Sequence, residues 1–107
     1  MPRLTTITAV SLCLLAAAPV GGRAARPHTV AIEATSFQPA TLTVKVGEGV
    51  VWANKDPFPH TATSQAAGFD SHAIPPGKSW RFTPKTKGEF AYICTLHPTM
   101  KATLRVE

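Results

Sequence analysis

The sequence predicts an all-β domain, a sandwich or barrel of antiparallel strands. Apolar residues alternate with polar ones at a period of two along most of the chain after residue 27. Clusters rich in proline and glycine separate the alternating runs. No stretch after residue 27 has the period of an amphipathic helix. Short strands with this punctuation and no helix are typical of antiparallel sandwiches and barrels.

The first half of the domain contains three runs that we expect to be half-buried strands. Within each run the apolar side chains share one parity: Val30 and Ile32; Leu42, Val44 and Val46; Val50 and Trp52. Turn signals follow the second and third runs, at residues 47–49 and 56–59.

The second half contains three more runs of the same kind. Their inward residues are predicted to be Trp80 and Phe82; Phe90, Tyr92 and Cys94; Ala102, Leu104 and Val106. Turn signals lie at residues 75–77 and 84–88. Residues 64–77 are the least regular part, and we expect a long loop there with room for a short turn of helix.

The N-terminal segment has the features of a secretory signal peptide. Arg3 precedes an apolar stretch over residues 4–18, and small residues follow up to Ala24. The apolar stretch is shorter than the ~20 residues needed to span a bilayer, so we expect no stable membrane insertion. Cleavage after Ala24 would leave one domain, residues 25–107, in the periplasm or outside the cell.

The charge is mildly basic. The whole chain has a formal charge of +5. Without residues 1–24, nine Lys and Arg face six Asp and Glu, which gives +3. The charges are scattered and the aromatic residues follow the core parity, so nothing indicates nucleic-acid binding. Lys55 and Lys101 flank the candidate metal residues, where they form either a rim that favours acidic partners or an ordinary solvated surface.

Four side chains form a candidate metal site. Cys94, His97 and Met100 are spaced three residues apart, and His60 lies upstream. Two His, one Cys and a weak axial Met are the ligand set of type 1 (blue) copper. Structural zinc prefers more thiolates and rarely a thioether, and iron–sulfur clusters need several thiolates. The competing interpretation is that Cys94 and Met100 are ordinary core residues.

The strand parity also predicts where these residues lie. Cys94 continues the inward face of Phe90 and Tyr92 just as that strand ends. His97 and Met100 then fall on the loop before the last strand, while His60 arrives from another part of the chain. The domain after residue 24 has one Cys and therefore no internal disulfide, so a bound metal would tie the two parts together.

Residues 27–107 resemble the cupredoxin family, in its amicyanin-like and plastocyanin-like branch. The motifs that carry the resemblance are Val30-x-Ile32, Phe37-x-Pro39, Leu42-x-Val44, Gly47, Val50-x-Trp52-x-Asn54-x-Asp56, Phe69-Asp70-Ser71, Pro76-Gly77 and Tyr92-x-Cys94-x-x-His97-x-x-Met100. The resemblance implies a Greek-key β-sandwich with one copper ion near one end, held by His60, Cys94, His97 and Met100. It also implies a monomer that shuttles single electrons between larger redox proteins, a donor and an acceptor.

Two positions differ from the family pattern. Thr61 follows His60 where many relatives have Asn, and we expect its hydroxyl to bond to the ligand loop and its amide to reach the thiolate. Leu96 occupies the position where amicyanin-like sequences usually have Pro. It restores a backbone N–H, which we expect to donate a second hydrogen bond to the sulfur.

An enzymatic role is disfavoured. In multicopper oxidases two His flank the Cys directly, whereas here the neighbours are Ile93 and Thr95. Only His28 and His72 remain for a second centre, and both are expected on the surface. A Cys–His nucleophile pair would leave Met100 without a role. The alternative to electron transfer that stays open is a periplasmic copper carrier, although such carriers favour exposed, exchangeable ligands.

Overall fold

The computed structural model describes residues 26–107, which form nine strands and no helix. The predicted signal peptide, residues 1–24, lies outside this part of the chain. Within residues 26–107 no helix is long and apolar enough to cross a bilayer.

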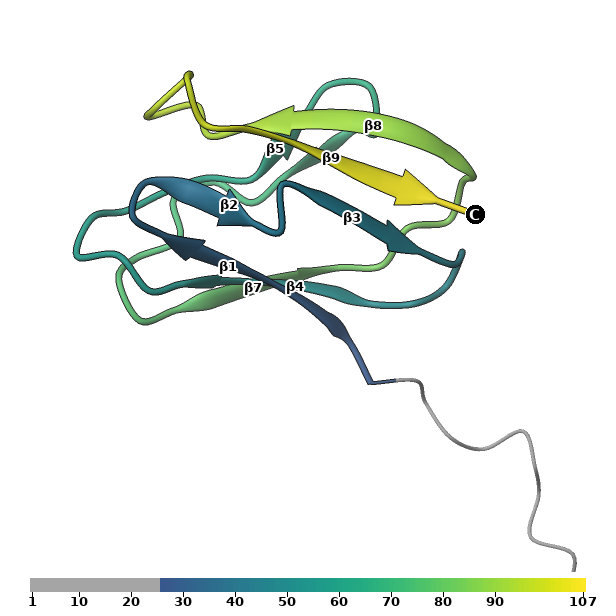
Figure 1. Cartoon of the computed structure of the whole chain (residues 1–107), viewed down its shortest axis with the longest axis horizontal. Helices are drawn as coiled ribbons and strands as arrows, with labels where there is room; N and C mark the ends of the chain where they lie inside the picture. Colours follow the sequence, from purple (N-terminus) through teal and green to yellow (C-terminus); the bar gives the residue numbers. More distant parts are fainter. Residues whose placement is uncertain (1–25) are drawn as a thin grey trace, which may run out of the picture.

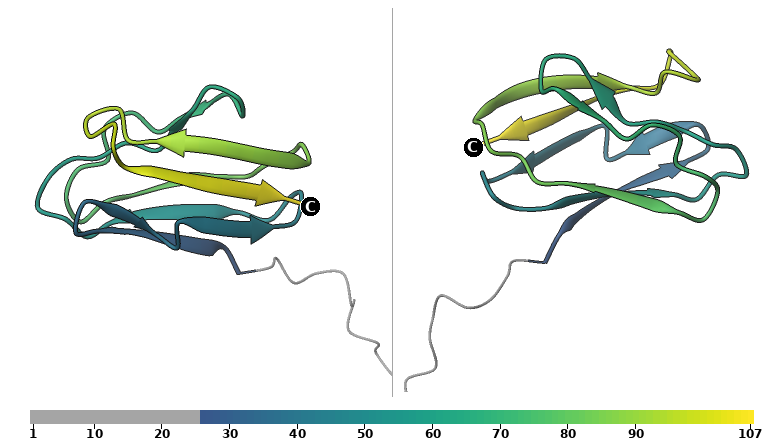
Figure 2. Two further views of the ribbon diagram at one scale, coloured as in Figure 1. Left: turned by 45° about the horizontal axis from the view of Figure 1, so that its top comes forward. Right: turned by 180° about the vertical axis from the view of Figure 1, so that it is seen from behind.

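Two sheets pack face to face (Figures 1 and 2). The four-stranded sheet has the order β2 (Ser36–Gln38), β1 (His28–Glu33), β4 (Val50–Asn54), β7 (Ser79–Phe82). The five-stranded sheet has the order β3 (Thr41–Val44), β9 (Lys101–Val106), β8 (Gly88–Ile93), β5 (Thr63–Ser64), β6 (Phe69–Asp70). The predicted all-β sandwich is confirmed.

Both sheets are mixed, which corrects the expectation of purely antiparallel strands. β1 pairs with β4 in parallel, with Val30 opposite Trp52, and β3 pairs with β9 in parallel, with Leu42 opposite Leu104. The chain crosses from one sheet to the other between β2 and β3 and returns before β4. Alternation in the sequence predicts which side chains face the core, but it does not predict which strands become neighbours.

The core follows the predicted parity with one clear exception. The last strand buries all three of its predicted residues, and Val30, Ile32, Val50 and Trp52 are fully buried. Val46 is 40% exposed, because β3 ends at Val44 and Val46 lies in the following turn. Continuing the alternation past the end of a strand caused that error.

Residues 64–77 form a small hairpin and an isolated bridge, and no turn of helix. β5 and β6 pair through Ser64 and Phe69. Gly68, with a φ of +69°, closes the turn between them, and its amide bonds to the Gln65 carbonyl at 3.2 Å. A left-handed φ favours glycine because glycine has no Cβ. The hairpin extends the second sheet beside β8.

Candidate metal centre

Three of the candidate ligands lie on the seven-residue connection between β8 and β9. Ile93 and Lys101, on either side of it, form a pair in the strand ladder. Inside the loop the Cys94 amide donates to the Met100 carbonyl at 3.2 Å, and the Met100 amide donates to the His97 carbonyl at 2.9 Å. These bonds curl the loop on itself and bring its donor side chains to one place.

The fourth candidate, His60, lies between β4 and β5. An isolated bridge holds its backbone to Ile74, with N–H···O distances of 3.2 and 2.7 Å in the two directions. His60 is fully buried. Its position is therefore fixed by backbone pairing on one side and by core packing on the other.

The donor atoms of Cys94, His60 and His97 converge. The Cys94 Sγ lies 3.7 Å from the His60 Nδ1 and 3.8 Å from the His97 Nδ1, and the three atoms all lie within 4.8 Å of one another. Donors about 2.1 Å (N) and 2.3 Å (S) from one ion, at trigonal angles, would be about 3.8 Å apart. The geometry fits a single ion held by one sulfur and two nitrogens.

Burial divides the candidates into an inner and an outer group. Cys94 is fully buried and Met100 nearly so, whereas the His97 ring is partly exposed and lies 4.8 Å from the His60 ring, centroid to centroid. One thiolate, two imidazoles and a buried thioether are arranged as a type 1 copper site, as the sequence predicted. His28 and His72 lie elsewhere, near Glu48 and Asp70 respectively.

Asp56 is a component of the site to which the sequence analysis gave no role. With its Nδ1 facing the sulfur, His60 presents Nε2 to the Asp56 Oδ2 at 2.8 Å, and both side chains are buried. The proton of the neutral ring therefore belongs on Nε2, which leaves the Nδ1 lone pair free for a metal. The signal in the sequence was an acidic residue four positions before a candidate ligand.

The Asp56 carboxylate is held from three directions. The amides of Ala34 and Thr35 donate to it, each at 2.8 Å, in addition to the His60 contact. Burial by itself raises the pKa of Asp56, but the hydrogen bonds from Thr35, His60 and Ala34 outweigh it and lower the pKa below its ordinary value. Asp56 is therefore a fixed, ionised group.

Thr61 makes both contacts that the sequence analysis expected of it. Its amide donates to the Cys94 Sγ at 3.3 Å. Its hydroxyl oxygen accepts from the Thr95 amide at 2.9 Å and from the Thr63 hydroxyl at 3.0 Å, and lies 3.1 Å from the Thr95 hydroxyl. All three bonding positions of the hydroxyl are used, so Thr61 links His60 firmly to the ligand loop.

The second hydrogen bond expected at the sulfur, from the Leu96 amide, is not found among the described residues. The loop turns so that the His97 amide donates to the Cys94 carbonyl at 3.3 Å. That turn carries Leu96 outward, where its side chain is 52% exposed. The expectation was wrong because a free N–H in the sequence does not determine the direction in which the loop points it.

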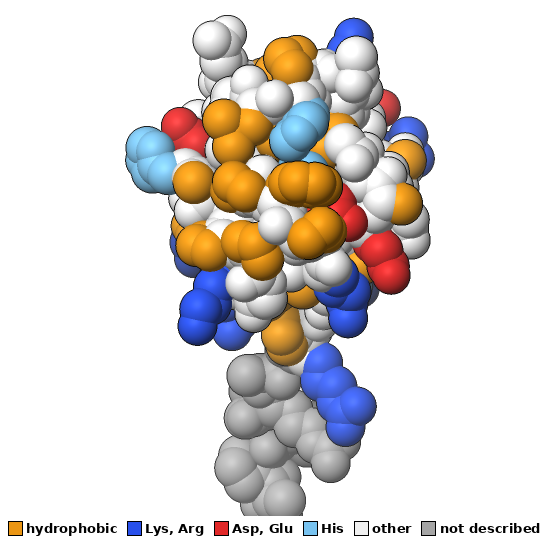
Figure 3. Space-filling model, turned by 90° about the vertical axis from the view of Figure 1, so that its left-hand side faces the viewer, with side chains coloured by type: hydrophobic (Ala, Val, Ile, Leu, Met, Phe, Trp, Pro, Cys, Tyr) orange, Lys and Arg blue, Asp and Glu red, His pale blue; other side chains and the backbone are white. Residues whose placement is uncertain are grey.

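The end of the sandwich that carries the ligand loop has an apolar surface. Figure 3 shows hydrophobic side chains gathered around a histidine, with Lys and Arg nearer the edges. The exposed large hydrophobic residues at this end are Phe58, at 57%, and Leu96. The partly exposed His97 lies on the same loop as Leu96, so a candidate ligand reaches the apolar surface.

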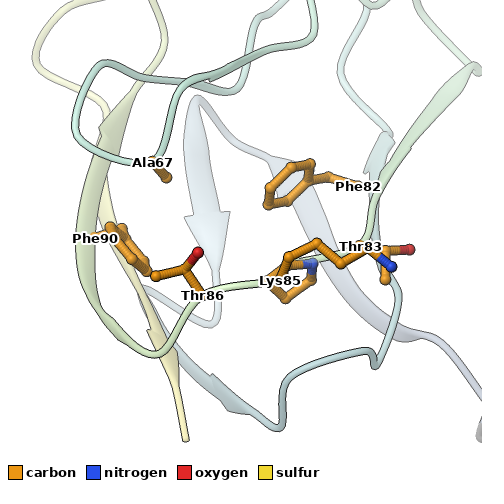
Figure 4. A pocket seen from close by; sticks show the side chains of 7 residues that line it. Ala67, Phe82, Thr83, Lys85, Thr86 and Phe90 are labelled. Atoms are coloured by element: carbon orange, nitrogen blue, oxygen red, sulfur yellow. The ribbon is translucent and has the colours of Figure 1, made fainter.

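A cavity of about 220 Å³ lies away from this end. Phe82 and Phe90, from the two sheets, face it from opposite sides, and Ala67 and residues 83–86 complete its lining (Figure 4). None of the lining residues is a candidate ligand. The metal chemistry therefore does not take place in this cavity.

Comparison with known proteins agrees with the fold and the donor set. A family model described as a cupredoxin-like domain matches residues 5–106. The chain belongs to the cupredoxin-like family. It is 31% identical over 84 residues to plastocyanin of Scenedesmus fuscus, covering 66% of this chain and 86% of the relative. Chloroplastic plastocyanin of Tetradesmus obliquus is 33% identical over 72 residues. The match covers 57% of this chain and half of the length of that relative.

Solved structures place this cupredoxin beside the amicyanins. The copper(I) form of a mutant amicyanin superposes with a TM-score of 0.72 at 27% identity, covering 80% of this chain and 87% of that one. A copper-containing nitrite reductase from Thermus scotoductus superposes with a TM-score of 0.71 at 32% identity, covering 76% of this chain but only 22% of the reductase chain. The predicted plastocyanin-like and amicyanin-like resemblance and the Greek-key sandwich are confirmed.

Proposed function

We propose that this cupredoxin transfers single electrons through one type 1 copper ion held by His60, Cys94, His97 and Met100. The observation that carries the proposal is the convergence of the Cys94 Sγ with the Nδ1 atoms of His60 and His97. When bound there, copper alternates between Cu(II) and Cu(I) and so carries one electron.

The residues around the ion keep the site similar in both oxidation states. His60 is fixed by its backbone bridge to Ile74, and the ligand loop is fixed by its internal bonds and by the Thr61 hydroxyl. A ligand cage that moves little lowers the reorganisation barrier to electron transfer. The buried thiolate is also shielded from solvent oxidants.

His97 provides the path to partner proteins. Its ring is partly exposed, and Phe58 and Leu96 give the same end of the molecule an apolar contact surface. Such a surface can exclude water when a larger redox protein docks. The partners are a donor and an acceptor of electrons, and Lys55 and Lys101 would favour acidic groups at the rim of their docking sites. The protein acts as a monomer.

The function proposed is not enzymatic. The nitrite reductase that superposes on this chain is several times longer, and this chain matches only 22% of it. Copper carriage is the less favoured role, because burial of Cys94, His60 and Met100 favours retention of the ion. The location proposed is the periplasm or the cell exterior, on the strength of the signal-like residues 1–24.

The deciding experiment is a visible and EPR spectrum of the protein loaded with copper(II). A type 1 site gives an intense blue thiolate-to-copper band, and Cys94→Ser should remove it while the sandwich stays folded. A colourless copper(II) protein, or a blue Cys94→Ser variant, would refute the proposed site. Slow release of copper to a competing chelator would separate electron transfer from carriage.

A further inference from the structure

We infer that Asp56 is a positioning residue that lowers the reduction potential of the centre, by fixing the His60 tautomer and by adding a second buried negative charge beside it. This rests on the proposed copper site. The carboxylate lies 2.8 Å from the His60 Nε2 and is 8% exposed, while His60 is fully buried. No role for this residue follows from the ligand set alone.

The charge balance gives the direction of the effect. A Cys94 thiolate and an Asp56 carboxylate together carry two negative charges, which balance the two positive charges of oxidised copper. In the reduced state the same group of residues would hold one uncompensated negative charge in a poorly solvated place. The one side-chain partner of the Asp56 carboxylate within residues 26–107 is the His60 ring, which is neutral as a metal ligand. No Lys or Arg within residues 26–107 forms an ion pair with the carboxylate, so its charge favours the oxidised state.

Hydrogen bonding acts in the same direction. A carboxylate that accepts a hydrogen bond from the Nε2–H increases the electron donation of the imidazole from its other nitrogen. The Nδ1 of His60 faces the Cys94 Sγ at 3.7 Å, so the more basic nitrogen is the one available to copper. Stronger donation stabilises Cu(II) relative to Cu(I).

The backbone amides that hold the carboxylate in this position belong to residues with strained backbone angles. Ala34 and Thr35 both have positive φ, 51° and 54°, in the turn between β1 and β2. Non-glycine residues rarely adopt these angles, and two-residue hairpin turns of this kind favour Asn-Gly. Both amides point at Asp56, with N···O distances of 2.8 Å. The strained turn therefore binds the carboxylate and aims it at His60.

The test compares Asp56→Asn with the wild type. The substitution removes the charge at nearly constant volume and leaves an oxygen to accept one amide. In the Asn variant we expect the ratio of Cu(I) to Cu(II) at a fixed ambient potential to rise at least tenfold. This corresponds to an increase of about 59 mV in the reduction potential of a one-electron couple. Voltammetry measures it. Asp56→Glu keeps the charge and should stay closer to the wild-type potential, which also keeps the proposal testable if the Asn variant does not fold.

Two controls separate tuning from a merely structural role. Glu89→Gln removes one negative charge from an exposed carboxylate near the start of β8, at the other end of that strand from Cys94, so it should leave the potential nearly unchanged. In the copper-free protein, ¹⁵N NMR should find the proton of neutral His60 on Nε2. A blue Asp56→Asn protein with an unchanged potential, or His60 protonated on Nδ1 in the wild type, would overturn the inference while leaving the proposed function intact. Absence of a blue wild-type spectrum would instead refute the function.

Discussion

The Thr61 amide donates a hydrogen bond to the Cys94 Sγ at 3.3 Å, although the two residues are 33 positions apart in the sequence. The same residue binds the Thr95 amide through its hydroxyl, at 2.9 Å. The residue after one candidate ligand therefore controls both the electronic environment of the sulfur and the conformation of the loop that carries it. A side-chain change at position 61 can separate these two effects.

Thr61→Val should weaken the loop and keep the blue colour. Valine has the same shape but no hydroxyl, so the Thr95 amide loses its acceptor, while the backbone bond to the sulfur remains. We expect a loss of about 1–2 kcal/mol in the free energy of unfolding of the copper-free protein. Chemical denaturation measures it.

A matched control for that substitution is Thr43→Val, on an exposed position of β3. Its stability should change by less than about 0.5 kcal/mol. Equal losses in the two valine variants would mean that the hydroxyl of Thr61 does not hold the loop.

Met100→Gln should keep copper bound and lower the reduction potential. An amide oxygen is a harder donor than a thioether and favours Cu(II) over Cu(I). Voltammetry of the copper-loaded variant measures the shift, with its visible spectrum as a check that the site is still formed. A potential equal to or above that of the wild type would exclude Met100 as the axial ligand.

Leu96→Lys should slow electron self-exchange, in which two copies of the protein meet at the same surface. Leu96 is 52% exposed on the ligand loop, and a lysine in each copy would repel the other at close approach. NMR line broadening in mixtures of the reduced and oxidised protein measures the rate. Added salt should restore part of it.

The comparison variant for the exchange experiment is Val46→Lys. Val46 is 40% exposed, and its amide donates to the carbonyl of Glu107, the residue after β9. The ligand loop precedes the other end of β9, so Val46 lies at the opposite end of the sandwich. The Val46→Lys variant adds the same charge far from the proposed electron path through His97 and should leave the exchange rate nearly unchanged. Equal slowing by both lysines would point to total charge and not to a contact surface at Leu96.

Tyr92→Phe should remove an alkaline loss of stability. Burial raises the pKa of Tyr92 to about 12 from its ordinary 10, with the Trp52 indole N–H acting in the opposite direction. The folded protein thus keeps a proton that the unfolded chain loses, and stability falls as pH rises from about 10 to about 12. The loss is on the order of 2–3 kcal/mol.

Denaturation of the copper-free protein between pH 9 and pH 12 measures that slope in both forms. At neutral pH the Phe variant should be no less stable, because among the described residues no group makes a hydrogen bond of good geometry to the buried Tyr92 hydroxyl; the Trp52 indole N–H is near enough to favour its ionised form but is itself unpartnered. Parallel pH dependences in the two proteins would show that Tyr92 titrates normally.

The sequence predicted those features that depend on local pattern. The inward direction of Cys94 followed from the parity of its strand, and the donor set followed from spacing and ligand softness. Two features depended on where distant segments meet. Asp56 gained its role from the amides of Ala34 and Thr35, more than 20 positions upstream, which fix its carboxylate against His60. No periodicity encodes that contact.

The error at Leu96 has a similar origin. A leucine, unlike a proline, has a backbone N–H that can donate a hydrogen bond. The conformation of the loop, which the residue type does not determine, sets where that N–H points. Since no bond from that amide to the sulfur is present in the described part of the chain, Leu96→Pro should leave the reduction potential nearly unchanged.

The seven residues from Cys94 to Met100 supply three of the donors and connect β8 to β9. These two strands are paired at six consecutive positions, from Gly88 opposite Val106 to Ile93 opposite Lys101. The ladder closes without any contribution from the loop. Insertions, deletions or exchange of this segment would therefore leave the registers of the sheet unchanged. The part of the spectroscopic and redox character that the loop sets can therefore diverge between descendants of one ancestor, while the scaffold that carries His60 and Asp56 stays the same.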